Sequence, residues 1–145
     1  FEDTLITPML IAGCNTIYYS DAGFYYYYDN EGGICNKHSF NSYFFLFRNL
    51  VALYERCAAI PELKQQSNKI LLRCMDNLID LRRGADCDKK GIAEANALVS
   101  KHNIDISTLY NMELDIKQKI KYTPFALFGA RIFSWLLSIG RKKLN

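Results

Sequence analysis

The 145-residue chain contains one tryptophan, three prolines and two histidines, and its net charge is only +3. The candidate zinc ligands are Cys35 and His38, with Cys14 and Cys87, but zinc sites usually pair two close clusters of ligands and the sequence has no second CxxC or HxxxH. The sequence has no phosphate-binding loop, dinucleotide-binding fingerprint or nucleophile elbow. We therefore predict no metal and no cofactor.

No apolar run reaches the roughly 20 residues that a bilayer-spanning helix needs. There is also no repeat of fixed period and no low-complexity linker. These absences predict one domain covering residues 1–145.

The cysteines lack the pattern of a disulfide framework. There are five of them, an odd number, and they are widely spaced: Cys14, Cys35, Cys57, Cys74 and Cys87. Secreted disulfide-rich chains usually carry an even number at closer intervals. We expect the protein to lie in an intracellular, reducing compartment. A peripheral position at a membrane within that compartment is one alternative.

Apolar residues recur at helical spacing from residue 39 onward. The pattern predicts helices over residues 40–60, 63–84, 92–99, 105–121 and 123–139, joined by connections of a few residues. The widest apolar face lies on residues 40–60, which suggests the buried central helix. The predicted fold is mainly α, an antiparallel bundle of about five helices over residues 38–145.

The segment 1–37 does not have helical periodicity. Residues 16–20 and 24–28 are β-prone and aromatic, and the three residues between them include Gly23. This pattern predicts a β-hairpin. Since side chains alternate across a strand, half of the second strand's rings, with Tyr25 and Tyr27 as the candidates, would meet a partner.

The predicted last helix is apolar almost all round and ends in a basic tail. From Asp115 to Asn145 there are seven basic residues and one acidic residue. Three roles are open: the last core helix with Trp135 as its largest anchor, a helix that binds a protein, or a helix that lies in a membrane surface. The core role is preferred because the other helices need a hydrophobic centre. For either binding role, the candidate residues are Phe128, Arg131, Trp135, Arg141, Lys142 and Lys143.

Cys35 is the candidate for nucleophilic chemistry. It follows Gly32 and Gly33 and precedes a predicted helix, where the dipole and free N–H groups would stabilise a thiolate. This arrangement resembles that of papain-like cysteine proteases, and the resemblance implies a cysteine-dependent hydrolase. Such an enzyme also needs a base, and His38 is too close along the chain to serve as one.

Residues 101–109 join two predicted helices by a tight turn, which suggests a helix-turn-helix. A recognition helix presents Arg, Asn or Gln to the bases. The second helix here continues to Glu113 and Asp115, and these acids would face phosphates. Nucleic acid is therefore the disfavoured partner.

The sequence thus predicts a non-enzymatic helical binding protein. It would bind through the aromatic hairpin, the apolar basic-tailed last helix, or both. A protein partner is preferred, an anionic membrane surface is the alternative, and self-association is a further option. The hydrolase and the nucleic-acid binder remain the rival functions.

Overall fold

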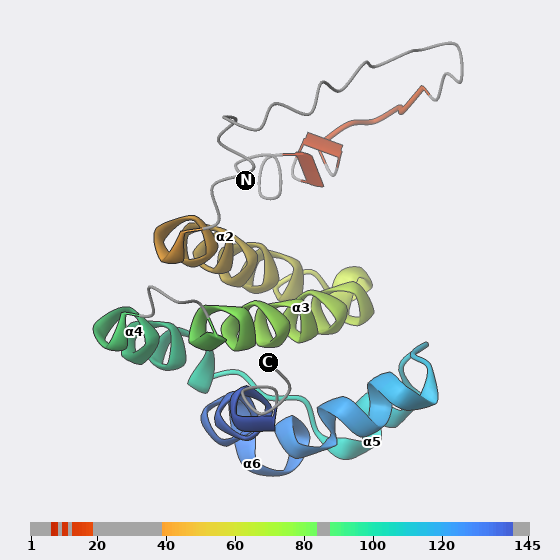
Figure 1. Cartoon of the computed structure of the whole chain (residues 1–145). Helices are drawn as coiled ribbons and strands as arrows, with labels where there is room; N and C mark the ends of the chain where they lie inside the picture. The colour runs from red at the N-terminus through yellow and green to blue at the C-terminus, as the bar shows by residue number, and fades with distance from the viewer. Residues whose placement is uncertain (1–6, 9, 12, 19–38, 84–87, 141–145) are drawn as a thin grey trace.

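The computed structural model describes residues 7–8, 10–11, 13–18, 39–83 and 88–140. Within these residues there are five α-helices and no strand (Figure 1). The helices are α2 (Phe40–Ala58), α3 (Lys64–Arg83), α4 (Lys89–Ser100), α5 (Ile106–Asn111) and α6 (Ile116–Gly140), with a short 3₁₀ turn, η2 (Pro61–Leu63), before α3. The prediction of a mainly helical bundle is confirmed.

Short polar side chains fix where three of the helices begin. Ser39 caps α2 by accepting the backbone N–H of Ser42 at 3.2 Å. Asp88 and Asp105 do the same for α4 and α5. Each cap satisfies N–H groups that the first turn of a helix leaves without partners.

Helix α3 is the centre of the molecule. It runs antiparallel to α2 on one side and packs against α6 on the other, and α2 does not contact α6 (Figure 1). The prediction that residues 40–60 form the central helix is therefore wrong. Helix α2 buries the side that includes Phe47 and Val51, but leaves Phe45 exposed, so its wide apolar face is only partly covered.

One cluster of buried side chains connects the helices. It contains Phe47 from α2, Met75 from α3, Val99 from α4, Leu109 from α5 and Phe133 from α6, each at most 4% exposed, among others. Removing this much apolar surface from water is the main force that stabilises a fold of this size.

The predicted helix over residues 105–121 is two helices. The backbone becomes extended at Met112, which ends α5, and α6 begins after Asp115. Asp115 accepts the N–H of Gln118 at 2.7 Å, and Gln118 accepts the N–H of Asp115 at 3.3 Å. This reciprocal capping box starts a new helix although the apolar spacing continues across it.

The predicted helix start at Thr123 and Pro124 is also wrong. Helix α6 passes through Pro124, and the Thr123 hydroxyl donates to the Lys119 carbonyl at 2.9 Å. The helical backbone is instead interrupted at Gly129, whose φ of 76° and ψ of 175° are essentially restricted to glycine. Helix α6 thus consists of two helical segments joined by a bend.

Aromatic rings pack across this bend. The ring centroids of Phe125 and Phe133 are 5.9 Å apart, and those of Tyr122 and Phe133 are 5.8 Å apart. In a straight helix, residues eight positions apart are separated by about 12 Å along the axis. The contacts therefore depend on the bend at Gly129.

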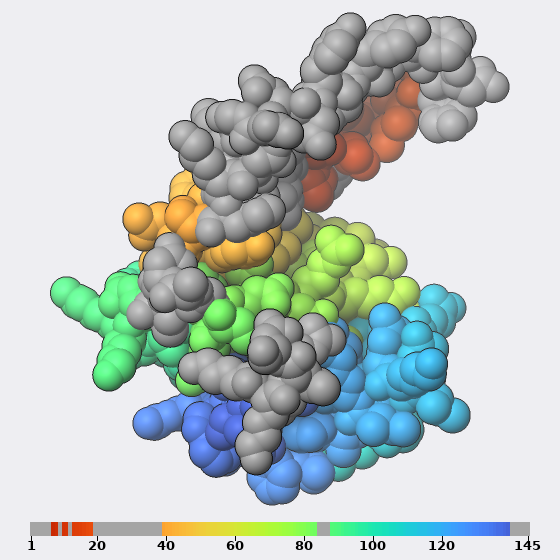
Figure 2. Space-filling view, viewed as in Figure 1, coloured from red at the N-terminus to blue at the C-terminus, as the bar shows by residue number. Residues whose placement is uncertain are grey.

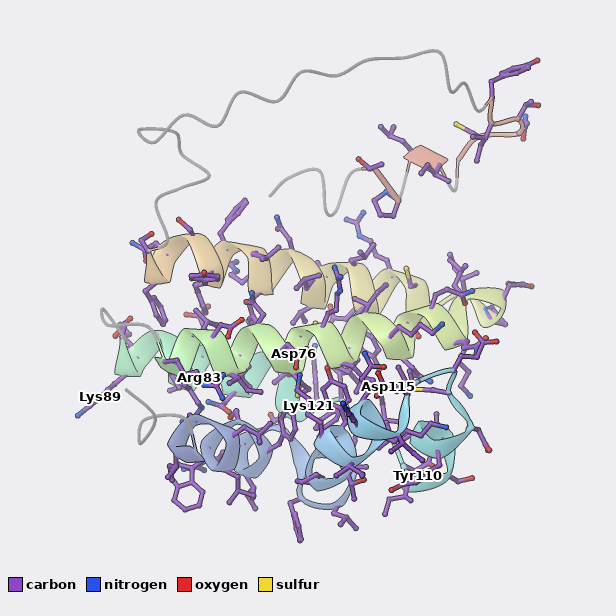
Figure 3. The ribbon with its side chains drawn as sticks, turned by 45° about the vertical axis from the view of Figure 1, so that its right-hand side comes forward. Asp76, Arg83, Lys89, Tyr110, Asp115 and Lys121 are labelled. Carbon is purple, nitrogen blue, oxygen red and sulfur yellow. The ribbon has the colours of Figure 1, made fainter. Side chains whose placement is uncertain are left out.

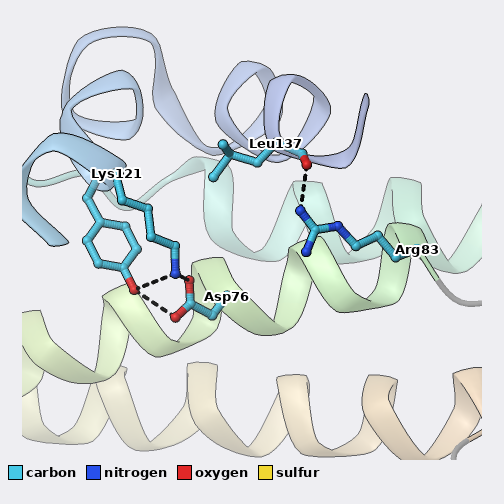
Figure 4. A network of polar contacts seen from close by, with 5 residues as sticks. Asp76, Arg83, Lys121 and Leu137 are labelled. Atoms are coloured by element: carbon cyan, nitrogen blue, oxygen red, sulfur yellow. Dashed lines mark hydrogen bonds and ion pairs between the residues drawn. The ribbon is translucent and has the colours of Figure 1, made fainter. Parts of the chain in front are cut away.

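Three side-chain hydrogen bonds attach α6 to α3, two in its first segment and one in its second (Figure 4). Asp76 accepts hydrogen bonds from the Tyr122 hydroxyl at 2.7 Å and from Lys121 Nζ at 2.6 Å. Arg83 donates to the carbonyl of Leu137 at 2.6 Å. A charged group on at least one side makes these bonds stronger than neutral ones.

The predicted β-hairpin is not supported. Of its residues only 16–18 are described, and none of these is in a strand; Tyr25 and Tyr27 lie outside the described residues. Four residues of the segment that was expected to lack helix, Thr7, Pro8, Leu10 and Ile11, have helical backbone.

Substituting alanine for Gly129 should destabilise the protein. In an ordinary helix interior the change from glycine to alanine stabilises by about 1 kcal/mol, but at this φ and ψ a Cβ is strained by about 1–3 kcal/mol. The space around Gly129 is open, so the backbone conformation alone decides whether alanine stabilises or destabilises the fold. Urea unfolding of Gly129→Ala measures the change in unfolding free energy, and a stabilised variant would contradict the bend.

Stability should fall as the pH rises above about 9. Burial raises the pKa of the Cys74 thiol from 9.0 to about 12. Burial and the hydrogen bond to Asp76 also raise the pKa of Tyr122 above its ordinary value of 10.0. The unfolded chain therefore loses these protons before the folded chain does, and stability is lost as the pH rises toward the folded pKa values, by at most about 1.4 kcal/mol per pH unit and group.

The contribution of Cys74 is measured by comparing unfolding free energies of the wild type and Cys74→Ala between about pH 8 and 11. The loss should be shallower in the variant. Equal slopes would show that the buried thiol does not contribute.

Candidate binding surface on helix α6

The second segment of α6 is apolar on two opposite faces. Ala130, Phe133 and Ser134 are buried, and Leu137 packs against the core. The positions halfway round the helix are also apolar, but their side chains are 42–53% exposed: Ile132, Trp135, Leu136 and Ile139. Steps of three and four residues place these four in one stripe.

The first segment repeats this arrangement. Tyr122 and Phe125 are buried on the inner face, whereas Ile116, Ile120 and Leu127 lie on the opposite face and are 73%, 64% and 54% exposed. Phe128, just before the bend, is also exposed. We call these eight exposed residues of α6 the outer stripe: Ile116, Ile120, Leu127, Phe128, Ile132, Trp135, Leu136 and Ile139.

The outer stripe carries more exposed apolar side chains than a surface helix ordinarily does. Scattered exposed apolar residues are normal, whereas a set that follows one face of one helix marks an interaction surface. In Figure 3, side chains of α6 project along the edge of the molecule that faces away from α2 and α3.

The segment that carries the outer stripe has side-chain charge of one sign. Residues 116–145 contain no aspartate or glutamate and seven basic residues. Lys117 and Arg131 are exposed on α6, while Lys121 contacts Asp76 and Lys119 donates to the carbonyl of Tyr110 at 2.7 Å. Helix α6 therefore combines exposed apolar side chains with exposed cations.

The outer stripe does not line either of two cavities in the described part of the chain. One cavity lies between α3, α4 and α6 and the other beside η2 and α5. Among the described residues no helix is both long enough and apolar enough to cross a membrane.

The structure places three of the predicted binding residues on this helix. Phe128 and Trp135 belong to the outer stripe, and Arg131 lies on the flank between the stripe and the core. Trp135 is 53% exposed, so its predicted role as the largest core anchor is wrong; Phe133 occupies that position with no exposure. Arg141, Lys142 and Lys143 lie outside the described residues, as does Cys35.

Ile132, Leu136 and Ile139 were not among the binding residues predicted from the sequence. A signal for them was present, because they share a face with Trp135 at helical spacing. The same spacing also groups Phe133 with Leu137, and the pattern alone does not tell which of two apolar faces is buried.

The cavity between α3, α4 and α6 is lined by three cations. Its volume is about 460 Å³, and its lining consists of Arg82, Lys89, Ile92, Ala93, Asn96, Ala97, Ser100 and Arg131. None of these residues is acidic. In Figure 2, α4 and the later part of α6 lie next to one another at the left side of the molecule.

The other polar groups do not form a catalytic arrangement within the described residues. Glu55 accepts Lys101 Nζ at 2.6 Å and contacts His102 at 3.2 Å, which lowers the pKa of Glu55, mainly through the bond from Lys101. Cys74 has no exposed surface, and burial raises its pKa, so it does not supply a thiolate. No group of three His, Cys, Asp or Glu among the described residues is placed to hold a metal ion.

Comparison with known proteins gives no relative: no family model, no curated protein and no solved structure matches the chain.

Alanine at Phe133 and at Trp135 should separate the two faces of α6. Phe133→Ala removes a fully buried ring and should cost about 3–5 kcal/mol of unfolding free energy. Trp135→Ala removes a half-exposed ring and should cost about 1 kcal/mol or less. Thermal or urea unfolding of both variants measures this, and equal losses would show that Trp135 is a core residue.

Proposed function

We propose that this protein is a non-enzymatic helical binding protein that attaches to an anionic membrane surface through the outer stripe of α6. The observation that supports the proposal is an exposed apolar stripe, opposite the core face of the same helix, in a segment that carries cations and no acid. Interfacial helices combine these features: an apolar face enters the acyl boundary, and basic residues meet the lipid phosphates.

The shape of the surface favours a membrane over a protein. Anchors of protein partners usually fill pockets, and neither the cavity between α3, α4 and α6 nor the one beside η2 and α5 is lined by a residue of the outer stripe. An exposed helix face inserts into lipid without needing a complementary groove. Trp135 adds an aromatic ring of the type that is enriched at the membrane interface.

The charge disfavours self-association through the same surface. Two copies joined stripe to stripe would bring two acid-free cationic segments together. Like charges that meet across an interface cost free energy. An anionic bilayer instead attracts each nearby basic residue by about 1 kcal/mol.

Binding to vesicles is expected to need both the apolar and the anionic component. Since Trp135 is the only tryptophan, its fluorescence should shift to the blue on vesicles that contain about one-quarter phosphatidylserine in phosphatidylcholine, and much less on phosphatidylcholine alone. The double variant Ile132→Ser, Leu136→Ser keeps the tryptophan and should bind more than tenfold more weakly. Added salt should weaken binding of the wild type.

Phe45→Ser is the matched control, because Phe45 is as exposed as Trp135 but lies on α2. This variant should bind vesicles like the wild type. An equal loss of vesicle binding in both variants would assign the binding to non-specific hydrophobic adsorption. Absence of binding to anionic vesicles would overturn the membrane proposal. A blue shift that grows with protein concentration alone would indicate self-association instead.

A further inference from the structure

We propose that the cavity between α3, α4 and α6 binds a phosphate group of the phosphomonoester type. One part of this inference, that the phosphate belongs to a membrane lipid, rests on the proposed function, since a lipid headgroup would bring such a phosphate to the outer stripe. The phosphate chemistry itself rests on the cavity alone.

Three helices direct cations to the cavity. Arg82 comes from the end of α3, Lys89 from the start of α4 and Arg131 from the second segment of α6. Within the described part of the chain, Lys89 and Arg131 form no ion pair. Clustered like charges repel one another, and a bound anion removes that repulsion.

The nearby carboxylate of Asp88 is engaged elsewhere. Its two oxygens accept the backbone N–H groups of Lys90 and Gly91, each at 3.0 Å, and it does not line the cavity. The charged side chains that line the cavity are therefore all cationic. Figure 3 shows Lys89 at the end of α4, at the outer edge of the bundle.

The remaining lining suits a small phosphorylated group. Asn96 and Ser100 provide polar side chains on α4, and the alanines and Ile92 form an apolar wall. The Asn96 side-chain oxygen is buried and receives no hydrogen bond from the described residues, and its amide nitrogen donates to the carbonyl of Ile92 at 2.7 Å. A guanidinium binds phosphate oxygens with two parallel hydrogen bonds.

The number of cations favours a monoester. A phosphomonoester carries a charge of about −1.5 to −2 at neutral pH, whereas a diester carries one negative charge. Lys89 and Arg131, which line the cavity and form no ion pair within the described residues, complement the higher charge better. Arg131 is also one helical turn before Trp135, so a headgroup in the cavity would lie beside the outer stripe.

The first measurement uses inorganic phosphate as the probe. Millimolar phosphate should raise the unfolding midpoint of the wild type above that in chloride of equal ionic strength, because a ligand that binds only the folded state stabilises it. Arg131→Gln and Lys89→Gln should each weaken the apparent affinity about tenfold. Both residues are exposed, so both variants are expected to fold.

Lys117→Gln is the matched control, because it removes one exposed charge from α6 outside the cavity. Its phosphate affinity should stay within about twofold of the wild type. Equal loss in Lys117→Gln and Arg131→Gln would mean diffuse electrostatic binding, and absence of phosphate stabilisation would mean no site. Either result overturns the inference.

The second measurement distinguishes a lipid phosphate from a free phosphate. It also tests the membrane proposal separately from the cavity. Vesicles containing phosphatidic acid should bind the wild type more tightly than phosphatidylserine vesicles of equal charge, and Arg131→Gln should abolish this preference. In vesicle flotation, which does not depend on tryptophan fluorescence, Trp135→Ala should lose vesicle binding, and it should keep phosphate stabilisation. Phosphate binding without vesicle binding would support a free phosphate ligand and overturn the membrane proposal, whereas vesicle binding without phosphate binding would overturn only the cavity.

Discussion

The bend at Gly129 is the constraint on which the rest of α6 depends. A glycine with positive φ turns the helix so that Phe133 contacts Phe125 and Tyr122. Without the turn, the second segment would continue past the end of the core, and its inner face would lose the aromatic contacts. The bend therefore lets both segments bury one face against the same centre.

Burying the inner face of each segment leaves an apolar face outside. A helix in a bundle ordinarily has a polar side toward solvent, but α6 has isoleucine, leucine, phenylalanine and tryptophan there. This surface is not needed to complete the core, since Phe133 and Phe125 already fill it. Excess apolar surface next to cations is the physical basis for a membrane role, and the basic cavity at its flank would give that role a chemical preference.

Most helices were predictable from the sequence because local signals and apolar spacing agree. The helix predicted over residues 63–84 is observed at Lys64–Arg83, whereas the one predicted over residues 92–99 begins earlier, at Lys89, because Asp88 caps it. The boundary at Asp115 was missed because Leu109, Met112, Ile116 and Ile120 continue the spacing across it. The capping box with Gln118 was visible in the sequence but conflicted with that spacing.

The binding surface was predictable only in part. The composition of residues 116–145 identified the helix, and Phe128, Arg131 and Trp135 were selected from it. Which face is buried depends on the bend, and the positive φ of Gly129 leaves no pattern in the sequence beyond the glycine itself. The cavity was not predictable, because Arg82, Lys89 and Arg131 are distant along the chain and converge only through tertiary packing.

The contact between Arg83 and the carbonyl of Leu137 has a consequence for local motion. The last carbonyls of a helix lack partners within the helix, and its final turn is where fraying begins. Here a guanidinium from α3 holds one of them at 2.6 Å. Unwinding of α6 from its C-terminal end should therefore stop near Leu137, and amide hydrogens in the turn before it should exchange with solvent more slowly than those beyond it.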